Sequence, residues 1–310
     1  MNYRSILIAT VQTIGLFVAG FVIPLLGQVI ALFTPVPLIL IYVRGSKQEG
    51  VSTLIGASAV IALLGGWQAA AILFFSFGLM AIGIGEGMRR NLKPERTTLL
   101  GGLLPIAVMV LIVIFYIARI GKSPIIVAEE YLRGSVAEAA KLYTSMGLTE
   151  MAATINSVSD TSIHYLVRLI PGILIATSVV QAACCYGISR SIILRSSPVE
   201  AAAAGNSLVS WHAPDSWVWG LIAALALVVV PQEAARLTGW NLAILFGIVY
   251  LAQGTAIVEH YLRKAGISAV MRGLILALVL ALPSIVFVIA LGVVDIWADF
   301  RKVRGTIPAA

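Results

Sequence analysis

The sequence predicts an all-α fold, a polytopic bundle of transmembrane helices with about eight or nine crossings, and two observations lead to this class. The first is composition: of 310 residues, 60% are hydrophobic and 11% are charged, with a mean hydropathy of +1.00. Soluble domains are about 45–50% apolar and about 25% charged. A soluble core of this length would be too small to bury so many apolar side chains. We therefore expect one integral membrane domain over residues 1–310.

The second observation is the length of the uncharged runs. A helix needs about 20 apolar residues to cross a hydrocarbon core roughly 30 Å thick. Backbone amides in lipid must pair within their own segment, which favours helices, and the runs lack the polar–apolar alternation of barrel strands. Five runs have about the length of one crossing: Thr97–Ala118, Leu169–Ser189, Ser216–Gln232, Leu237–Val258 and Gly273–Val294.

The first uncharged run, Ser5–Val43, is longer than one crossing. It also exceeds the roughly 7–15 apolar residues of a signal peptide, so we expect it to be retained. Pro24 and the segment Thr34–Pro37 interrupt it, because proline lacks the backbone donor that a helix needs. We expect one helix to about Ala31 and then a short or re-entrant piece that ends near Tyr42.

The second uncharged run, Gly50–Gly85, is also longer than one crossing. Gly65-Gly66 divides it, because glycine is a poor helix former. We expect a short helix before this pair and a longer helix after it, ending at Arg89-Arg90.

The pattern Gly83-Ile84-Gly85-Glu86-Gly87 has two interpretations. It resembles the GxGD motif of intramembrane aspartyl proteases, with Glu in place of Asp, but that chemistry needs a second carboxyl group, and no apolar run supplies it. The glycines, one helical turn apart, instead favour a close contact between helices. The chain also lacks the GxxxxGK[ST], HExxH, CxxC and GxSxG motifs. We therefore predict that the protein is not an enzyme and holds no cofactor or metal.

The longest polar region covers residues 121–162. Its apolar residues fall near helical spacing, which predicts an amphipathic helix or helix pair outside the bundle. Such a pair would lie on the membrane surface or pack over the bundle, with a recruiting or gating role. A plain solvent-facing cap is the alternative. The charged residues interspersed there are Glu129, Glu130, Arg133, Glu138 and Lys141.

The net charge of +7 is explained by Lys and Arg in short loops beside the runs. Orientation and anionic headgroups favour basic residues there, so we expect contact with the lipid bilayer of the cell (inner) membrane and no nucleic-acid binding. The basic tail Arg301–Arg304 falls on the side opposite to the other basic loops, so the side of the C-terminus stays open. The loops expected to share one side, with residues 121–162 on the other, are Arg44/Lys47, Arg89–Arg96, Arg190/Arg195 and Arg263–Arg272.

Several polar side chains lie within or at the ends of the apolar runs. Ionisable groups at membrane depth usually face a cavity or a partner, because burial in lipid is unfavourable for them. The alternative is interfacial capping and hydrogen bonding between helices. Our candidates for lining a solute site are Glu86, Asn241, Gln253, Glu259 and Asp295.

Three elements carry a family resemblance: Pro35-Val36-Pro37, the Asn241…Gln253-Gly254 crossing, and the ending that starts at Asp295-Ile296-Trp297. Together they resemble the YybS-like family of uncharacterised bacterial membrane proteins. The N-terminal half is similar to the substrate-binding subunits of energy-coupling-factor vitamin transporters. That similarity implies a small-molecule pocket and an ATPase module as a partner in trans.

Three functions remain open at this point. The leading hypothesis is a transport-type protein that binds a small polar or amphipathic solute among its helices. The second is a membrane scaffold or regulatory subunit that recruits other proteins through residues 121–162 and the basic loops. An intramembrane enzyme ranks last, because no nucleophile, metal set or acid pair is visible.

Overall fold

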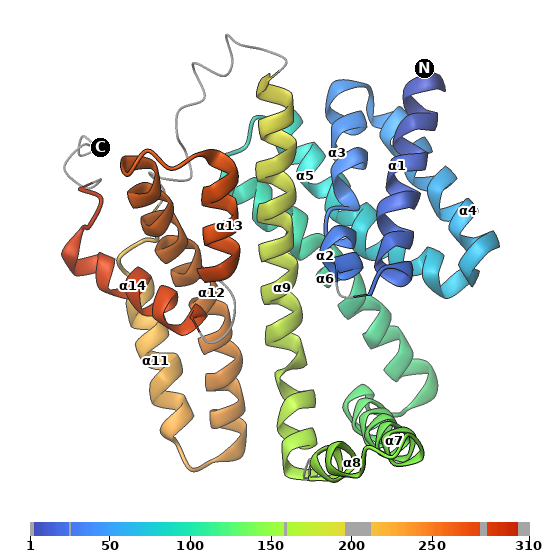
Figure 1. The fold of residues 1–310 in the computed structure, drawn as a ribbon, viewed down its shortest axis with the longest axis vertical. Coiled ribbons are helices and arrows are strands. Elements are labelled where there is room, and N and C mark those ends of the chain that lie inside the picture. The colour runs from blue at the N-terminus through green and yellow to red at the C-terminus, as the bar shows by residue number, and fades with distance from the viewer. Residues whose placement is uncertain (1–2, 25, 158–159, 196–211, 280–283, 303–310) are drawn as a thin grey trace. The chain divides into compact units, whose positions relative to one another are not determined.

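The computed structural model describes residues 3–24, 26–157, 160–195, 212–279 and 284–302 (Figure 1). Within these ranges all regular elements are helices, and the chain divides into two compact units. Unit 1 comprises Met1–Val167 and Thr177–Glu200, and unit 2 comprises Arg168–Ala176 and Ala201–Ala310. The helices are α1 (Tyr3–Val22), α2 (Leu26–Ala31), α3 (Pro35–Arg44), α4 (Lys47–Ile72), the π-helical η1 (Leu73–Gly78), α5 (Leu79–Arg89), α6 (Pro94–Ile120), α7 (Pro124–Ser145), α8 (Thr149–Asn156), α9 (Asp160–Arg195), α11 (Trp217–Val229), α12 (Glu233–Lys264), α13 (Ala269–Val279) and α14 (Ile285–Ala298).

The predicted all-α membrane fold is confirmed. Within the described part of the chain, six helical stretches are long and apolar enough to cross a membrane, and α11 and α14 are shorter apolar helices. The longest stretch has 43 residues, about twice the length that one crossing requires. The number of eight or nine crossings therefore stays a prediction. The six stretches are Tyr3–Val22, Leu26–Arg44, Lys47–Arg89, Pro94–Ile120, Asp160–Arg195 and Glu233–Lys264.

The first uncharged run breaks earlier than predicted. The expected helix to Ala31 is wrong, because α1 ends at Val22 and α2 returns along it. Two contacts explain the turn. The side-chain amide of Gln28 donates to the carbonyl of Gly20 over 2.7 Å. A Cβ at Gly27 would collide with the carbonyl group of Ala19, so only glycine permits this approach.

The 43-residue stretch turns at Gly66, whose φ of +84° and ψ of 170° lie outside the helical region. Glycine adopts this backbone conformation without the steric penalty of a Cβ. Leu73, after the turn, packs on Ala57 and Ile61, before it. The two arms therefore lie against each other, and the second ends at Arg89. The predicted division at Gly65-Gly66 is confirmed.

Helix α5 packs closely between α6 and α3 within unit 1. A Cβ at Gly83 would lie 2.9 Å from the Cα atom of Gly101 in α6, and Gly87 faces the first turn of α6. On another side of α5, Gly85 faces the ring of Tyr42 in α3. Small residues let helix backbones approach to van der Waals contact. The predicted close contact through the Gly83–Gly87 pattern is confirmed.

Residues 121–162 include the predicted pair of helices, α7 and α8. Helix α6 ends at Ile120, and the next residue, Gly121, redirects the chain with a φ of +70°. One ion pair and one further polar contact join α7 to the first turns of α9. Arg133 Nε lies 2.9 Å from Asp160 Oδ1, and Glu129 Oε1 lies 3.4 Å from His164 Nδ1. Figure 1 shows α7 and α8 at the end of unit 1 where α6 ends and α9 begins.

In unit 2, α12 packs against both α11 and α14. Its contact with α14 is close, because a Cβ at Gly254 or at Gly292 would collide with backbone atoms of the opposite helix. The core beside this contact contains Val218, Tyr250 and Ile296. The polar residues 196–214, between two of the uncharged runs, lie mostly outside the described residues.

Candidate functional site

The five predicted site residues fall into four separate environments. Glu86 lies in unit 1, and the other four lie in unit 2. Only Gln253 and Asp295 contact each other directly. Each environment decides whether its residue serves packing or is available to a ligand.

Glu86 joins the ends of three helices in unit 1. Its carboxylate accepts a hydrogen bond from the Tyr42 hydroxyl of α3 over 3.2 Å. The ammonium of Lys47, at the start of α4, lies 2.8 Å from Oε2, and Arg90 Nε lies 2.6 Å from Oε1. The Arg44 guanidinium donates to the Ile192 carbonyl of α9, so the basic end of α9 lies at the same end of unit 1. Glu86 therefore holds helix ends together within a basic surface.

Asn241 links α12 to the stretch of α9 that belongs to unit 2. Its Nδ2 donates to the carbonyls of Arg168 and Leu237 over 3.1 and 2.9 Å. Its Oδ1 accepts from the Gly172 backbone amide over 2.8 Å. Arg168 and Gly172 lie four residues apart, the spacing of one helical hydrogen bond, and flank Pro171, which lacks a donor. Asn241 therefore supports a helix at its proline and has a structural role.

Gln253 and Asp295 form the centre of a buried polar chain. Gln253 Oε1 accepts from the Ala213 amide over 3.1 Å, and its Nε2 donates to Asp295 Oδ2 over 3.0 Å. Asp295 Oδ2 also lies 3.0 Å from the guanidinium of Arg301, and Oδ1 accepts from the Phe300 amide. Gln253 is fully buried, and Asp295 is 3% exposed. These bonds anchor the segment after α14, so this pair also stabilises the fold.

Glu259 is the predicted residue that borders open space. Its Oε1 lies 2.6 Å from Arg263 Nε on the same helix and 3.1 Å from Arg272 Nε on α13. The three side chains line a hollow of about 280 Å³ between α12 and α13. The rest of the lining is formed by Thr255, Ala256, Gly273 and Leu276. The lining of the hollow therefore combines two arginines and one carboxylate with one polar residue and several small or apolar residues.

Sequence reasoning missed the two arginines of this hollow as site residues. Arg263 follows Glu259 by four residues, a helical spacing at which opposite charges meet, so a local signal was present. Arg272 belongs to the next helix, and no local spacing connects it to Glu259. Arg301, the buried partner of Asp295, was assigned to a basic tail and gave no signal of burial.

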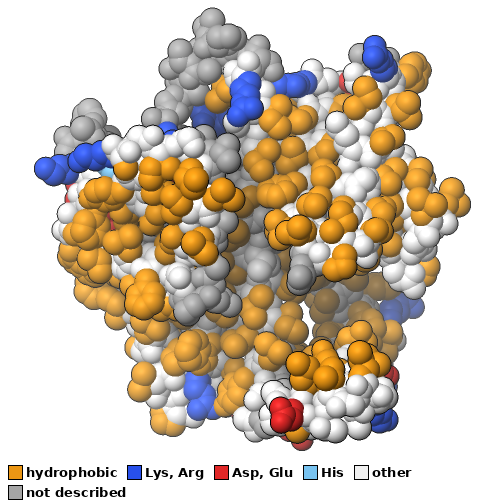
Figure 2. All heavy atoms as spheres, viewed as in Figure 1, with side chains coloured by type: hydrophobic (Ala, Val, Ile, Leu, Met, Phe, Trp, Pro, Cys, Tyr) orange, Lys and Arg blue, Asp and Glu red, His pale blue; other side chains and the backbone are white. Residues whose placement is uncertain are grey.

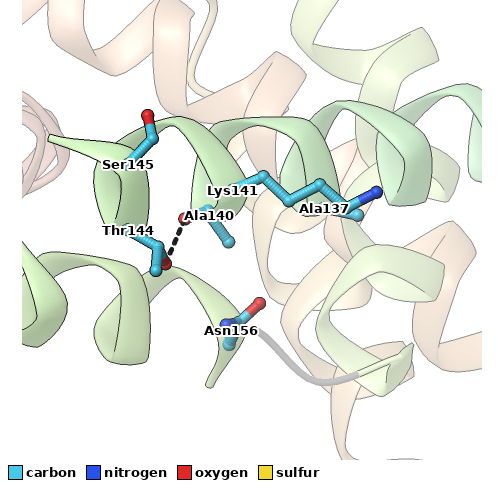
Figure 3. Close-up of a pocket in the computed structure, with 6 residues that line it drawn as sticks. All are labelled: Ala137, Ala140, Lys141, Thr144, Ser145 and Asn156. Atoms are coloured by element: carbon cyan, nitrogen blue, oxygen red, sulfur yellow. Dashed lines mark hydrogen bonds between the residues drawn. The ribbon is translucent and has the colours of Figure 1, made fainter.

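A larger hollow of about 510 Å³ lies between α7 and α8 in unit 1. Figure 3 shows its lining, in which Lys141 extends along α7 and the Thr144 hydroxyl donates to the Ala140 carbonyl over 2.9 Å. Lys141 is the one charged group of this lining, which is completed by Ala137, Ser145 and Asn156. The α12–α13 hollow brings several charged groups together and is the better candidate site.

The helices define the class of the protein: it is a multi-pass helical membrane protein, whose exposed apolar surface contacts a lipid bilayer. Over residues 11–296 the chain matches the model of a family described as "Predicted membrane protein (DUF2232)", and it belongs to this family. No curated protein matches the chain, and no solved structure does. Membership of a family of membrane proteins is thus confirmed, and the narrower resemblances to YybS-like proteins and to energy-coupling-factor subunits stay predictions.

Proposed function

We propose that this protein binds a small solute with an anionic group in the hollow between α12 and α13, and takes part in moving it across the cell (inner) membrane. One observation carries the proposal. Arg263 and Arg272 converge on a single carboxylate oxygen of Glu259 at 2.6 and 3.1 Å. Two guanidinium groups face one carboxylate, and the excess positive charge favours a further anionic group. Arginine presents several donors in a planar fork that suits carboxylates and phosphates.

The lining of the hollow supports a solute that is also partly apolar. Ala256 and Gly273 are small residues that leave space between the helices, and Leu276 supplies apolar surface. Ligand sites commonly combine an apolar lining with a few polar groups and have volumes of about 300–1,000 Å³. A volume of about 280 Å³ lies near the lower end of that range, which suits a small metabolite.

The transport role needs a source of energy or a gradient. The chain has no ATP-binding motif, so an energised version would use an ATPase module in trans. The ends of α3, α4, α5 and α9 in unit 1 carry basic residues near one another, and the positive-inside rule places such ends in the cytoplasm. This basic surface supports the proposed inner-membrane orientation, and we propose that the partner binds there. We propose no catalytic role.

The experiment is purification from native membranes in mild detergent, followed by mass spectrometry of retained small molecules and proteins. We expect an anionic metabolite with the wild-type protein and at least a tenfold lower amount with Arg272→Gln. Arg133→Gln is the matched control, because Arg133 is also an ion-paired arginine and lies on α7. Equal retention by Arg272→Gln, or no retained metabolite, contradicts the proposal. Recovery of other proteins without a metabolite would favour the scaffold hypothesis.

A further inference from the structure

Helix α7 has an exposed apolar side that no described part of unit 1 covers. Tyr131, Leu142 and Met146 are 77%, 60% and 63% exposed. At about 100° per residue, these three positions fall within roughly 60° of one another around the helix. By this geometry the exposed Glu138 lies about 20° from Tyr131, at the edge of the apolar side, and Lys141 and Glu130 lie about 80° and 100° from Tyr131 in the same direction. The helix is therefore amphipathic across its exposed surface, in addition to the side that packs on its neighbours.

Helix α7 lies beside the ends of two long apolar helices of unit 1. Both neighbouring helices, α6 and α9, are candidate membrane spans. The last turns of α6 expose Phe115, Ile117 and Ile120, which in a membrane-spanning helix contact lipid. The ion pair of Arg133 with Asp160 holds α7 against the start of α9. Figure 2 shows hydrophobic side chains on the side of α7 and α8 nearest the spanning helices of unit 1, with charged side chains along the far edge.

We propose that α7 and α8 lie flat on the bilayer surface, with the Tyr131–Leu142–Met146 side inserted at the boundary between headgroups and acyl chains. The inference is independent of the solute site in unit 2 and identifies a lipid surface as the partner of this region. Lipid is favoured as the occupant because α7 follows directly after the exposed apolar end of α6, which is a candidate membrane span. Interfacial helices combine an apolar face in the lipid with a charged face in water, and α7 has both.

The test measures how deeply two neighbouring positions of α7 lie in the membrane. The full chain, with Cys184→Ser and Cys185→Ala to remove the native thiols, is reconstituted into phosphatidylethanolamine–phosphatidylglycerol vesicles containing acyl-brominated lipid. A fluorophore is attached at Leu142→Cys or at Lys141→Cys. We expect brominated lipid to quench the probe at 142 at least threefold more than the probe at 141. Aqueous iodide should quench in the reverse order.

A second pair of variants protects the test against misfolding of one protein. Tyr131→Cys and Glu130→Cys should show the same contrast, because they occupy the same two sides of α7. Leu111→Cys on α6, where Leu111 is 64% exposed, is the positive control for quenching by lipid. Equal quenching at the two positions of a pair would overturn the proposal. Protection of position 142 from both quenchers would also overturn it, because protein would then cover this side.

Discussion

Gln253 on α12 donates its side-chain amide to the carboxylate of Asp295 on α14, with an N–O distance of 3.0 Å between two buried residues. The two positions are separated by more than 40 residues in sequence, and the Ala213 amide completes the partners of Gln253. The buried side-chain amide of Gln253 therefore makes one hydrogen bond to α14 and one to the residue Ala213 before α11. These two bonds hold α12, α14 and the residues before α11 in one arrangement.

We predict that Gln253→Leu lowers the free energy of unfolding by about 1–3 kcal/mol, because it leaves the buried Ala213 amide without its acceptor and removes one donor from the buried Asp295 carboxylate. Thermal unfolding in detergent, followed by the fluorescence of a thiol-reactive dye, measures this. Tyr250→Phe is the control. Its buried hydroxyl has no hydrogen-bond partner in the described part of the chain, and its loss should change stability little. Equal effects of the two substitutions would contradict the assigned role of Gln253.

A second prediction concerns the ion pair between Asp295 and Arg301, whose side chains are 4% and 1% exposed. Asp295→Asn leaves a buried guanidinium without its counter-charge, and we expect a loss of about 3–5 kcal/mol. The double substitution Asp295→Asn with Arg301→Met should recover part of this loss, because it removes the uncompensated charge. The same unfolding measurement decides the matter: a double variant no more stable than Asp295→Asn would count against a coupled pair.

Helices α5 and α6 cross closely at Gly83, so we predict that a larger side chain at this position destabilises the fold. A Cβ there would meet the backbone of Gly101 and the carbonyl oxygen of Leu100 at 2.9 Å, so Gly83→Ala forces the helices apart. We expect destabilisation of about 1–3 kcal/mol. Gly187→Ala on α9 meets nothing within 4 Å and should be neutral or stabilising by up to about 1 kcal/mol, since alanine is the better helix former. Comparable unfolding temperatures for the two variants would refute the close contact.

Filling the α12–α13 hollow should remove solute binding without unfolding the protein. Gly273→Leu places a side chain in the space that Gly273 leaves open. We expect at least a tenfold lower amount of retained anionic metabolite at an unchanged unfolding temperature. Gly134→Leu is the matched control, because Gly134 also meets nothing within 4 Å and lies on α7. Full retention by Gly273→Leu would show that the solute binds elsewhere.

The two ends of α6 should be accessible from opposite sides of the membrane. Lys93 and Lys122 flank this 27-residue span, and the basic end of unit 1 that includes Lys93 is expected in the cytoplasm. In intact cells, with the native cysteines replaced, an impermeant maleimide should label Lys122→Cys and should label Lys93→Cys only after permeabilisation. The opposite pattern would invert the orientation, and equal labelling would contradict a crossing by α6.

Local sequence was enough to predict the elements whose physics is local. Uncharged runs of about 20 residues indicate spans because lipid excludes unpaired charge. Gly66 marked a turn, and Gly83 with Gly87 marked a close helix contact, because each depends on the lack of a Cβ. The apolar residues of 121–162, which fall near helical spacing, indicated an amphipathic helix pair, because this spacing brings them to one side of a helix.

The tertiary structure alone decided which polar groups meet. Proline marked the break in the first run, but the end of α1 at Val22 depends on how Gln28 and Gly27 contact α1 across the turn. For the predicted site residues, the sequence indicated only that polar groups lie near membrane depth, and it did not indicate which groups they contact. Asn241 and Gln253 share a helix, yet they bind different neighbours, and Arg272 reaches Glu259 from a separate helix. Hydrogen bonds and ion pairs act over about 3 Å, so they form only after packing has brought distant segments together.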